Sequence, residues 1–339
     1  MREGGGGSGP CRGVNEQVTQ SGGGVRHRLE FWLIAVVTAL VRVSPWPLAR
    51  AAGTVVGLLF YLFDAPHRRI TLDNLARAFP ARAAGERRMI ARQVFSHFGR
   101  VLIELLKLST LQPSELLARI EFEGDERARQ AYAKGAGVIF FTGHFGYWEL
   151  CGIVHAIRVA PIGLLARPLD NPHLNALLER IRQATGNTVI YRRGAIRRVM
   201  RMLSANRGVA MLIDQHTHPP DAVSVDFFNR PAATTSSLAA LTLRTGAPAI
   251  PVFAIPLPRG RYRMIYERPI EPPPADDPDA IRVFTQRCTD VLEMYVRRYP
   301  GLWLWMHRRW RDGGAGEGVR GMFPAARRDV ELAPPGDES

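Results

Sequence analysis

The segment 142–149 places a histidine and a carboxylate five residues apart, at His144 and Glu149. On a regular helix, the two side chains would point about 140° apart and could not meet. They can meet where His144 lies on a turn between a strand and a helix and Glu149 projects back from the first helical turn. Gly143 and Gly146 give such a turn its backbone freedom. A carboxylate that holds the Nδ1–H of an imidazole leaves Nε2 free to take a proton. We therefore predict that His144 is a general base oriented by Glu149.

The nucleophile is expected to be a hydroxyl of the substrate, because no serine or cysteine accompanies His144 at a comparable spacing. An acyl-enzyme formed on a serine or threonine is one alternative. A buried histidine with a purely structural role is another. The position of His144 directly after an apolar run, between two glycines, favours catalysis.

The elements that must hold this motif follow from the hydrophobic pattern. Short continuous apolar runs, typical of buried strands, occupy 137–142, 208–213 and 249–255. The last run precedes a turn at 258–261 and a second strand at 262–267, which indicates a hairpin. Helical patterns lie between these strands, at 171–185, 196–205 and 235–245. The alternation predicts an α/β fold with a central mixed sheet flanked by helices.

The N-terminal part contains two apolar stretches, 31–41 and 51–63, separated by arginines and prolines. Neither reaches the roughly 20 residues that cross a bilayer. Arg28 before them and Arg68 after them favour keeping both ends on the cytoplasmic side. We predict a membrane-associated helical hairpin that lies in one leaflet. A secretory signal and an ordinary buried hairpin are the alternatives.

Composition restricts the class of protein. Of 339 residues, 46% are apolar and 22% charged, which excludes a disordered, collagen-like or multi-span membrane protein. The net charge is +14, and residues 26–311 carry +17 because the segments outside them are neutral or acidic. An acidic partner is therefore expected, either a nucleic acid, an anionic membrane or a phosphorylated substrate. The three cysteines are too far apart for a disulfide framework or a zinc module.

The motif at 142–149, in this setting, resembles that of the glycerolipid acyltransferase superfamily. Its glutamate variant, a His-x4-Glu motif, is similar to that of the lipid A biosynthesis lauroyl/myristoyl acyltransferase family. Further blocks resemble this family in the same order, and together they cover 28–311. They are His67-Arg68-Arg69 with Asn74-Leu75 and Phe79-Pro80, the run 166–172, Asp214-Gln215 with the run 226–232, and the run 303–310. Asn229 stands where the family usually has glycine, and Ala166 where an aromatic residue is common.

The resemblance implies acyl transfer from an acyl carrier protein or coenzyme A thioester to a hydroxyl of a glycolipid, a lipid A precursor. It implies no metal and no cofactor beyond this co-substrate. His144 would deprotonate the hydroxyl, and Glu149 would fix the tautomer. Helix-start N–H groups beside His144, or Arg167, would stabilise the oxyanion. The substrate-binding residues would be Arg167, Asn171, Asp214, Gln215, Arg308 and Arg309.

The expected organisation is a disordered tail at 1–25, a membrane-associated segment at 26–66, an acyltransferase domain at 67–311 and a second disordered tail at 312–339. We expect a monomer at the inner membrane of the cell, in lipopolysaccharide biosynthesis, with its active site on the cytoplasmic side. No recognition module for nucleic acid accompanies the arginines.

Three other interpretations remain open. One is a phosphatidylinositol mannoside-type acyltransferase, and another is a non-catalytic lipid-binding protein of the same fold. The third is a metal site, because Asp214, His216 and His218 alternate, although their spacing supplies no further ligands.

Overall fold

The structure is a computed structural model that describes residues 25–191, 194–274 and 276–311. The two predicted tails lie outside these residues, except for residue 25 at the start of the first helix.

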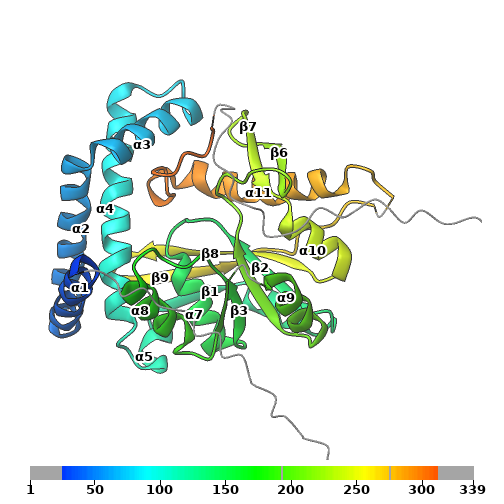
Figure 1. The fold of residues 1–339 in the computed structure, drawn as a ribbon, viewed down its shortest axis with the longest axis horizontal. Coiled ribbons are helices and arrows are strands. Elements are labelled where there is room, and N and C mark those ends of the chain that lie inside the picture. Colours follow the sequence, from blue (N-terminus) through cyan, green and yellow to red (C-terminus); the bar gives the residue numbers. More distant parts are fainter. Residues whose placement is uncertain (1–24, 192–193, 275, 312–339) are drawn as a thin grey trace, which may run out of the picture.

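A seven-stranded mixed sheet forms the centre of the molecule (Figure 1). Its strand order is β1-β9-β8-β2-β5-β3-β4, and every neighbouring pair is parallel except β8 and β9. The strands are β1 (Ile120–Glu123), β2 (Val138–Thr142), β3 (Ile162–Leu165), β4 (Thr188–Ile190), β5 (Gly208–Leu212), β8 (Ala249–Leu257) and β9 (Arg261–Tyr266). The predicted α/β class and the hairpin after residue 249 are confirmed.

Strand β2 lies between β5 and β8, and all five of its residues are buried. Successive side chains of a strand point to opposite faces, so a strand covered on both faces is apolar throughout. Ile139 and Phe141 face one core cluster, together with residues of α10 (Ser237–Thr245) and α11 (Ala280–Arg298). Val138 and Phe140 face the other, together with residues of α6 (Asp125–Tyr132) and α7 (Trp148–Arg158). The continuous apolar run of the sequence thus reflects a central strand.

Helices flank the sheet on both faces. After the N-terminal pair they are α3 (Ala65–Ala78), α4 (Ala84–Leu108), α5 (Pro113–Leu117), α6 (Asp125–Tyr132), α7 (Trp148–Arg158), α8 (Pro172–Gln183), α9 (Ala195–Ser204), α10 (Ser237–Thr245) and α11 (Ala280–Arg298). Two short 3-10 helices, η1 (Pro258–Gly260) and η2 (Pro300–Leu302), follow β8 and α11, respectively.

A separate antiparallel hairpin consists of β6 (Ala222–Asp226) and β7 (Pro231–Thr235). Phe227 and Arg230 exchange backbone hydrogen bonds of 2.9 and 3.3 Å across its turn. The two residues between them, Phe228 and Asn229, have φ values of +55° and +57°. Asparagine tolerates this left-handed conformation better than most residues, which explains how Asn229 replaces a glycine here.

Helices α1 (Val25–Val43) and α2 (Trp46–Phe63) form the N-terminal hairpin, and Figure 1 shows them with α4 at one side of the molecule. Helix α2 packs along α4 at a contact made by Gly53, Gly57 and Gly99. A Cβ atom on Gly99 would lie 2.2 Å from the carbonyl oxygen of Gly53, so the two backbones touch there. Small residues permit such an approach.

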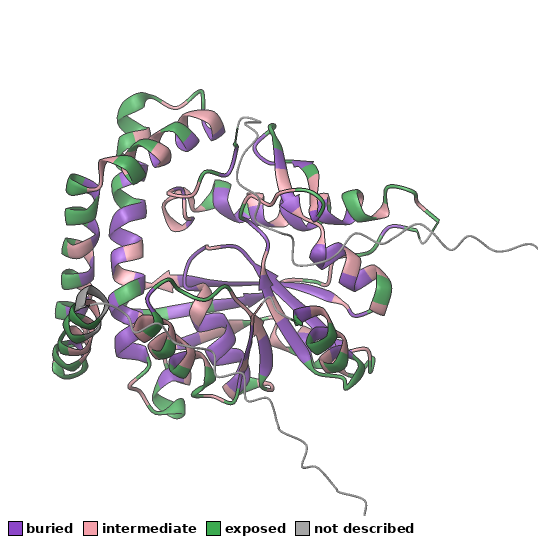
Figure 2. Cartoon of the chain, in the orientation of Figure 1, coloured by how far each residue is buried: buried purple, intermediate pink, exposed green. Residues whose placement is uncertain are grey.

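Much of the surface of α1 and α2 is exposed (Figure 2), and most of the large side chains on it are apolar. We call it the apolar face. Its large residues are Leu29, Trp32, Leu33, Val36, Leu40, Val43, Leu48, Val55, Leu58, Leu59, Phe60, Leu62 and Phe63. Among the described residues, α2 is the helix with the length and hydropathy of a candidate membrane segment. Exposed apolar area of this extent is typical of an interaction surface.

Candidate active site

His144 and Asp214 lie at the carboxyl ends of two adjacent parallel strands. The register of β2 and β5 pairs Thr142 with Leu212, and each site residue follows its paired strand end by two positions. His144 Nδ1 donates to Asp214 Oδ1 over 2.9 Å, and the backbone N–H of His144 donates to Oδ2 over 2.7 Å. This pairing leaves Nε2 as the nitrogen that can exchange a proton.

The prediction that Glu149 holds the ring of His144 is wrong, because Asp214 takes that place. Glu149 instead forms a bidentate ion pair with Arg182 of α8, with N···O distances of 2.8 and 2.5 Å. Its position in the first turn of α7 directs the carboxylate toward α8. The carboxylate nonetheless lies close enough to act on His144 through its charge.

The His144–Asp214 pair is electrostatically coupled. Asp214 is 3% exposed, and it also accepts a hydrogen bond of 2.8 Å from Nε1 of Trp303. Burial tends to raise the pKa of Asp214, but the charge and hydrogen bonds of His144, with the bond from Trp303, lower it to about 2. Burial likewise tends to lower the pKa of His144, and the charge and hydrogen bond of Asp214, followed by the charge of Glu149, raise it overall. Asp214 is therefore an ionised partner that stabilises the imidazolium.

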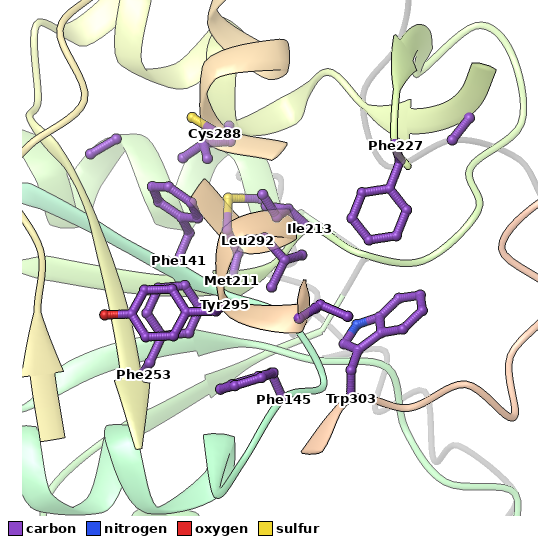
Figure 3. Close-up of a cluster of buried hydrophobic side chains, with 14 of the residues drawn as sticks. Phe141, Phe145, Met211, Ile213, Phe227, Phe253, Cys288, Leu292, Tyr295 and Trp303 are labelled. Atoms are coloured by element: carbon purple, nitrogen blue, oxygen red, sulfur yellow. The ribbon is translucent and has the colours of Figure 1, made fainter. Parts of the chain in front are cut away.

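Residues 302–304, near the end of the described chain, pack against the turn that carries His144. Phe145 and Trp303 form a backbone bridge, and their side chains lie in the same buried cluster in Figure 3. Leu304 donates its N–H to the carbonyl of His144 over 3.0 Å. Gly146 has a φ of +56°, and a Cβ atom there would lie 2.1 Å from the carbonyl oxygen of Ala254. A glycine is thus required at this position.

The N–H groups beside His144 are already occupied. The backbone N–H of His144 donates to the carboxylate of Asp214. The N–H groups of the next three residues donate to backbone carbonyls over 2.7 to 2.9 Å. The candidates for stabilising an oxyanion therefore narrow from the N–H groups beside His144 to those at the start of α7. Trp148 and Glu149, in the first turn of α7, have no preceding helical carbonyl to bind.

The other predicted substrate residues are dispersed. Arg167 is exposed between β3 and α8, and Gln215 and Arg308 are also exposed. Asn171 caps α8, since its side chain accepts from the N–H groups of His173 and Leu174 and donates to Glu30.

Arg309 points into the protein. It is 1% exposed, and its guanidinium donates to the carbonyl of Ala233 and the hydroxyl of Thr234. Burial lowers its pKa to about 10. These contacts give Arg309 a packing role beneath the β6–β7 hairpin, where it does not reach a substrate from solvent.

Two apolar spaces adjoin the site. A cavity of about 70 Å³ is lined by Glu149 and Arg182 and by apolar residues of α7, β2, β3 and β5, including Cys151 and Leu164. A groove of about 440 Å³ lies between α2 and α4 and reaches His307. Trp148 lies between residues of both spaces, because it lines the cavity while its ring contacts His144 and Phe98, a residue of the groove.

Sequence reasoning missed Arg182 and His307. Arg182 lies on a predicted helix among several arginines, and no local pattern distinguishes it. His307 Nε2 accepts the backbone N–H of His216 over 3.1 Å, so the neutral ring carries its proton on Nδ1. Across the described ranges, no group of three or more histidines, cysteines or acids is placed to hold a metal ion.

A buried carboxylate behind a histidine, at the ends of parallel strands and beside apolar spaces, is the arrangement of an enzyme with a general base and a site for an apolar substrate. Residues 24–312 match the family described as bacterial lipid A biosynthesis acyltransferase, and the chain belongs to this family. The protein is an acyltransferase.

Individual relatives are distant but cover most of the chain. The chain is 24% identical to the lipid A biosynthesis palmitoleoyltransferase of Escherichia coli over 86% of its length and 94% of the relative. It is 22% identical to the lipid A biosynthesis myristoyltransferase of the same organism, over 88% of the chain and 91% of that relative. It is also 22% identical to a phosphatidylinositol mannoside acyltransferase of Mycolicibacterium smegmatis, over 70% of the chain and 77% of that relative.

Proposed function

We propose that the protein transfers a fatty acyl chain from a thioester to a hydroxyl of a membrane glycolipid, a lipid A precursor. The observation that carries this proposal is the His144–Asp214 pair, whose sequence neighbours Trp148 and Gln215 line two apolar spaces. Relatives named for lipid A biosynthesis support the choice of acceptor.

In the proposed reaction, Nε2 of His144 removes the proton of the acceptor hydroxyl as its oxygen attacks the thioester carbonyl. The tetrahedral intermediate then expels the thiolate, and the imidazolium returns the proton to the sulfur. An ester forms, a thioester breaks, and His144 regains its neutral state. A positioned base of this kind contributes about 10²–10⁴-fold in rate.

Glu149 has a proposed catalytic role that differs from holding the ring. Its charge favours the imidazolium form of His144, and its ion pair with Arg182 anchors the start of α7. The N–H groups of Trp148 and Glu149 in that turn are the proposed oxyanion donors. Arg167 is a further candidate, since it is exposed just after β3.

The cavity beside Glu149 is proposed to receive the part of the donor acyl chain nearest the thioester, because its other lining residues are mostly apolar and its volume of about 70 Å³ is below that of sites that enclose a whole ligand. Either acyl carrier protein or coenzyme A is the proposed donor. Both are anionic, which suits the exposed Arg197, Arg198 and Arg201 of α9. Two further arginines that the sequence places in this cluster, Arg192 and Arg193, lie outside the described residues.

The apolar face of α1 and α2 supports association of the protein with a membrane. The proposed location is the inner membrane, with the active site on its cytoplasmic side. One side of α2 packs against α4, so only its other side is open to lipid. This arrangement favours a hairpin that lies in one leaflet over one that spans the bilayer. A monomer, without a metal or a resident cofactor, is part of the same proposal.

The test is acyl transfer by purified protein in detergent micelles, with acyl carrier protein and coenzyme A thioesters as donors. A lipid A precursor and a phosphatidylinositol mannoside are compared as acceptors, since one relative acts on the latter class by name. We expect product with the lipid A precursor and none from the folded His144→Ala variant. Tight lipid binding without turnover would instead indicate a non-catalytic lipid-binding protein.

A further inference from the structure

The groove beside α2 and α4 is lined mostly by apolar residues, with the hydrogen-bonded pair Asp64 and His67 just beyond α2 and further polar groups at its inner end. Val56, Gly57 and Phe60 of α2 face Phe95, Phe98, Gly99 and Leu102 of α4. Gln215 and His307 lie among its lining residues, with Leu304 and Met306 of the C-terminal segment. Its volume of about 440 Å³ falls in the range of sites that enclose a small-molecule ligand.

The inner end of the groove adjoins the catalytic base. Leu304, which lines the groove, donates its N–H to the carbonyl of His144 over 3.0 Å. On the α4 side, the ring of Phe98 lies 5.7 Å from that of Trp148, which lies 5.4 Å from the ring of His144. A chain lying in the groove would therefore bring its polar end close to His144.

The outer end of the groove meets the apolar face. Phe60 belongs to both, since it lines the groove and is 57% exposed. Its neighbours Leu59 and Phe63 are also exposed on α2. The apolar residues of the groove thus connect the surface proposed to contact the membrane with the surroundings of the proposed base, so a lipid chain would lie mostly against apolar side chains.

We propose that this groove admits the acyl chain of the acceptor glycolipid sideways from the bilayer, with the polar part of the lipid directed toward Gln215 and His307. This inference rests on the proposed function and specifies how the acceptor reaches the site. The acceptor is assigned here because its chains already lie in the membrane. The donor chain arrives on a water-soluble carrier, and the separate cavity beyond Trp148 is open to it.

His307 suits the polar end of such a ligand. Burial is the main cause that lowers its pKa, to about 4, so it is neutral at pH 7. Its Nε2 is occupied by the N–H of His216, and Nδ1–H remains as the donor of the ring. A neutral donor can bind a lipid carbonyl, hydroxyl or phosphate oxygen without a buried charge.

The first experiment fills the groove. Val56→Trp places a large ring in it, and Ala51→Trp is the matched control, because Ala51 is exposed on the same helix but lies outside the groove and is not one of the named residues of the apolar face. We expect Val56→Trp to raise KM for the lipid A precursor at least tenfold while KM for the acyl donor stays within twofold. Ala51→Trp is expected to match the wild type in both constants.

A second pair of variants tests the inference independently, in case Val56→Trp does not fold. Leu102→Trp fills the groove from α4, where Leu102 is already half exposed, and Met89→Trp is an exposed control on the same helix. Thermal unfolding of each variant is measured beside its kinetics. The inference predicts the same selective rise in acceptor KM for Leu102→Trp.

The third experiment locates the chain directly. A lipid A precursor with a diazirine near the end of one acyl chain is irradiated with the His144→Ala protein, and labelled peptides are identified by mass spectrometry. We expect labels within 56–60 and 95–102. Labels confined to residues that line the cavity would overturn the inference.

The outcomes separate this inference from the proposed function. If the wild type transfers no acyl group to any lipid, the proposed function fails. If it is active and the groove-filling variants match their controls, the function stands and the inference fails. A rise in donor KM with unchanged acceptor KM would assign the groove to the donor and would also overturn the inference.

Discussion

The carboxylate of Asp214 receives both the ring Nδ1–H and the backbone N–H of His144, over 2.9 and 2.7 Å. One carboxylate therefore fixes the tautomer of the base and the turn that carries it. Because the two residues follow the paired ends of β2 and β5, the register of the sheet sets this geometry.

Asp214→Asn is expected to lower kcat by about 10²–10⁴-fold with little change in KM, since it removes the ionised partner of the imidazolium. Steady-state kinetics on protein with a native unfolding temperature check this result. Trp303→Phe, which removes one hydrogen bond to the same carboxylate, is expected to have a smaller effect. Full activity of a folded Asp214→Asn protein would contradict the assignment.

The pH profile of kcat/KM is expected to fall on the acidic side, because the base must be neutral. Burial tends to lower the pKa of His144, but Asp214 and Glu149 raise it overall, so the acidic limb should lie above the ordinary value of about 6.5. In Asp214→Asn, the residual activity should show this limb at lower pH. A limb that does not move would mean that another group titrates.

The raised pKa of His144 also makes the free energy of unfolding depend on pH. A histidine whose pKa is raised in the folded state stabilises the fold below its unfolded pKa of about 6.5. This contribution is lost as the pH rises through the folded pKa. Urea unfolding at several pH values, compared between wild type and His144→Gln, should show a smaller pH slope for the variant in this range.

The Glu149–Arg182 ion pair is expected to behave as a coupled unit. Both side chains are mostly buried, so Glu149→Leu or Arg182→Met alone leaves an unpaired charge and should destabilise the protein by up to about 3 kcal/mol. The double variant should be more stable than the sum of the single effects predicts. Denaturant unfolding of all four proteins measures the coupling, and strict additivity would show that the pair contributes no interaction energy.

The contact between α2 and α4 depends on Gly99. Ala at this position would meet the backbone of Gly53 and Gly57, and we expect a loss of roughly 2 kcal/mol despite the higher helix propensity of alanine. Gly85 on the same helix has nothing within 4 Å of its would-be Cβ, so Gly85→Ala should be neutral or stabilising. Thermal unfolding and binding to anionic vesicles are measured for both. Equal effects of the two substitutions would contradict this packing.

The predictable parts of the fold were those with continuous patterns. Strands β2, β5 and β8 are apolar runs of at least five residues, and all three were predicted near their observed bounds. Strands β3 and β4 have four and three residues, too short for a periodicity to show. The chemistry at His144 was visible because its histidine, glycines and glutamate are close in sequence.

The partner of His144 was assigned incorrectly because closeness in sequence was taken for closeness in space. Asp214 was recognised as a site residue, but its role depends on the pairing of β2 with β5. One signal was available, since Asp214, like His144, comes directly after a predicted strand. The partner of Glu149, by contrast, depends on how α7 and α8 pack, which no local pattern reveals.

The closing contacts from Leu302, Trp303 and Leu304 affect the order in which the protein becomes active during synthesis. The helices and strands that carry His144 and Asp214 leave the ribosome long before these residues do. Until residue 303 has emerged, the turn at His144 lacks its bridge and Asp214 lacks the indole bond. A nascent chain therefore completes the surroundings of its base only after residue 303 has left the ribosome, well after the strands that precede His144 and Asp214.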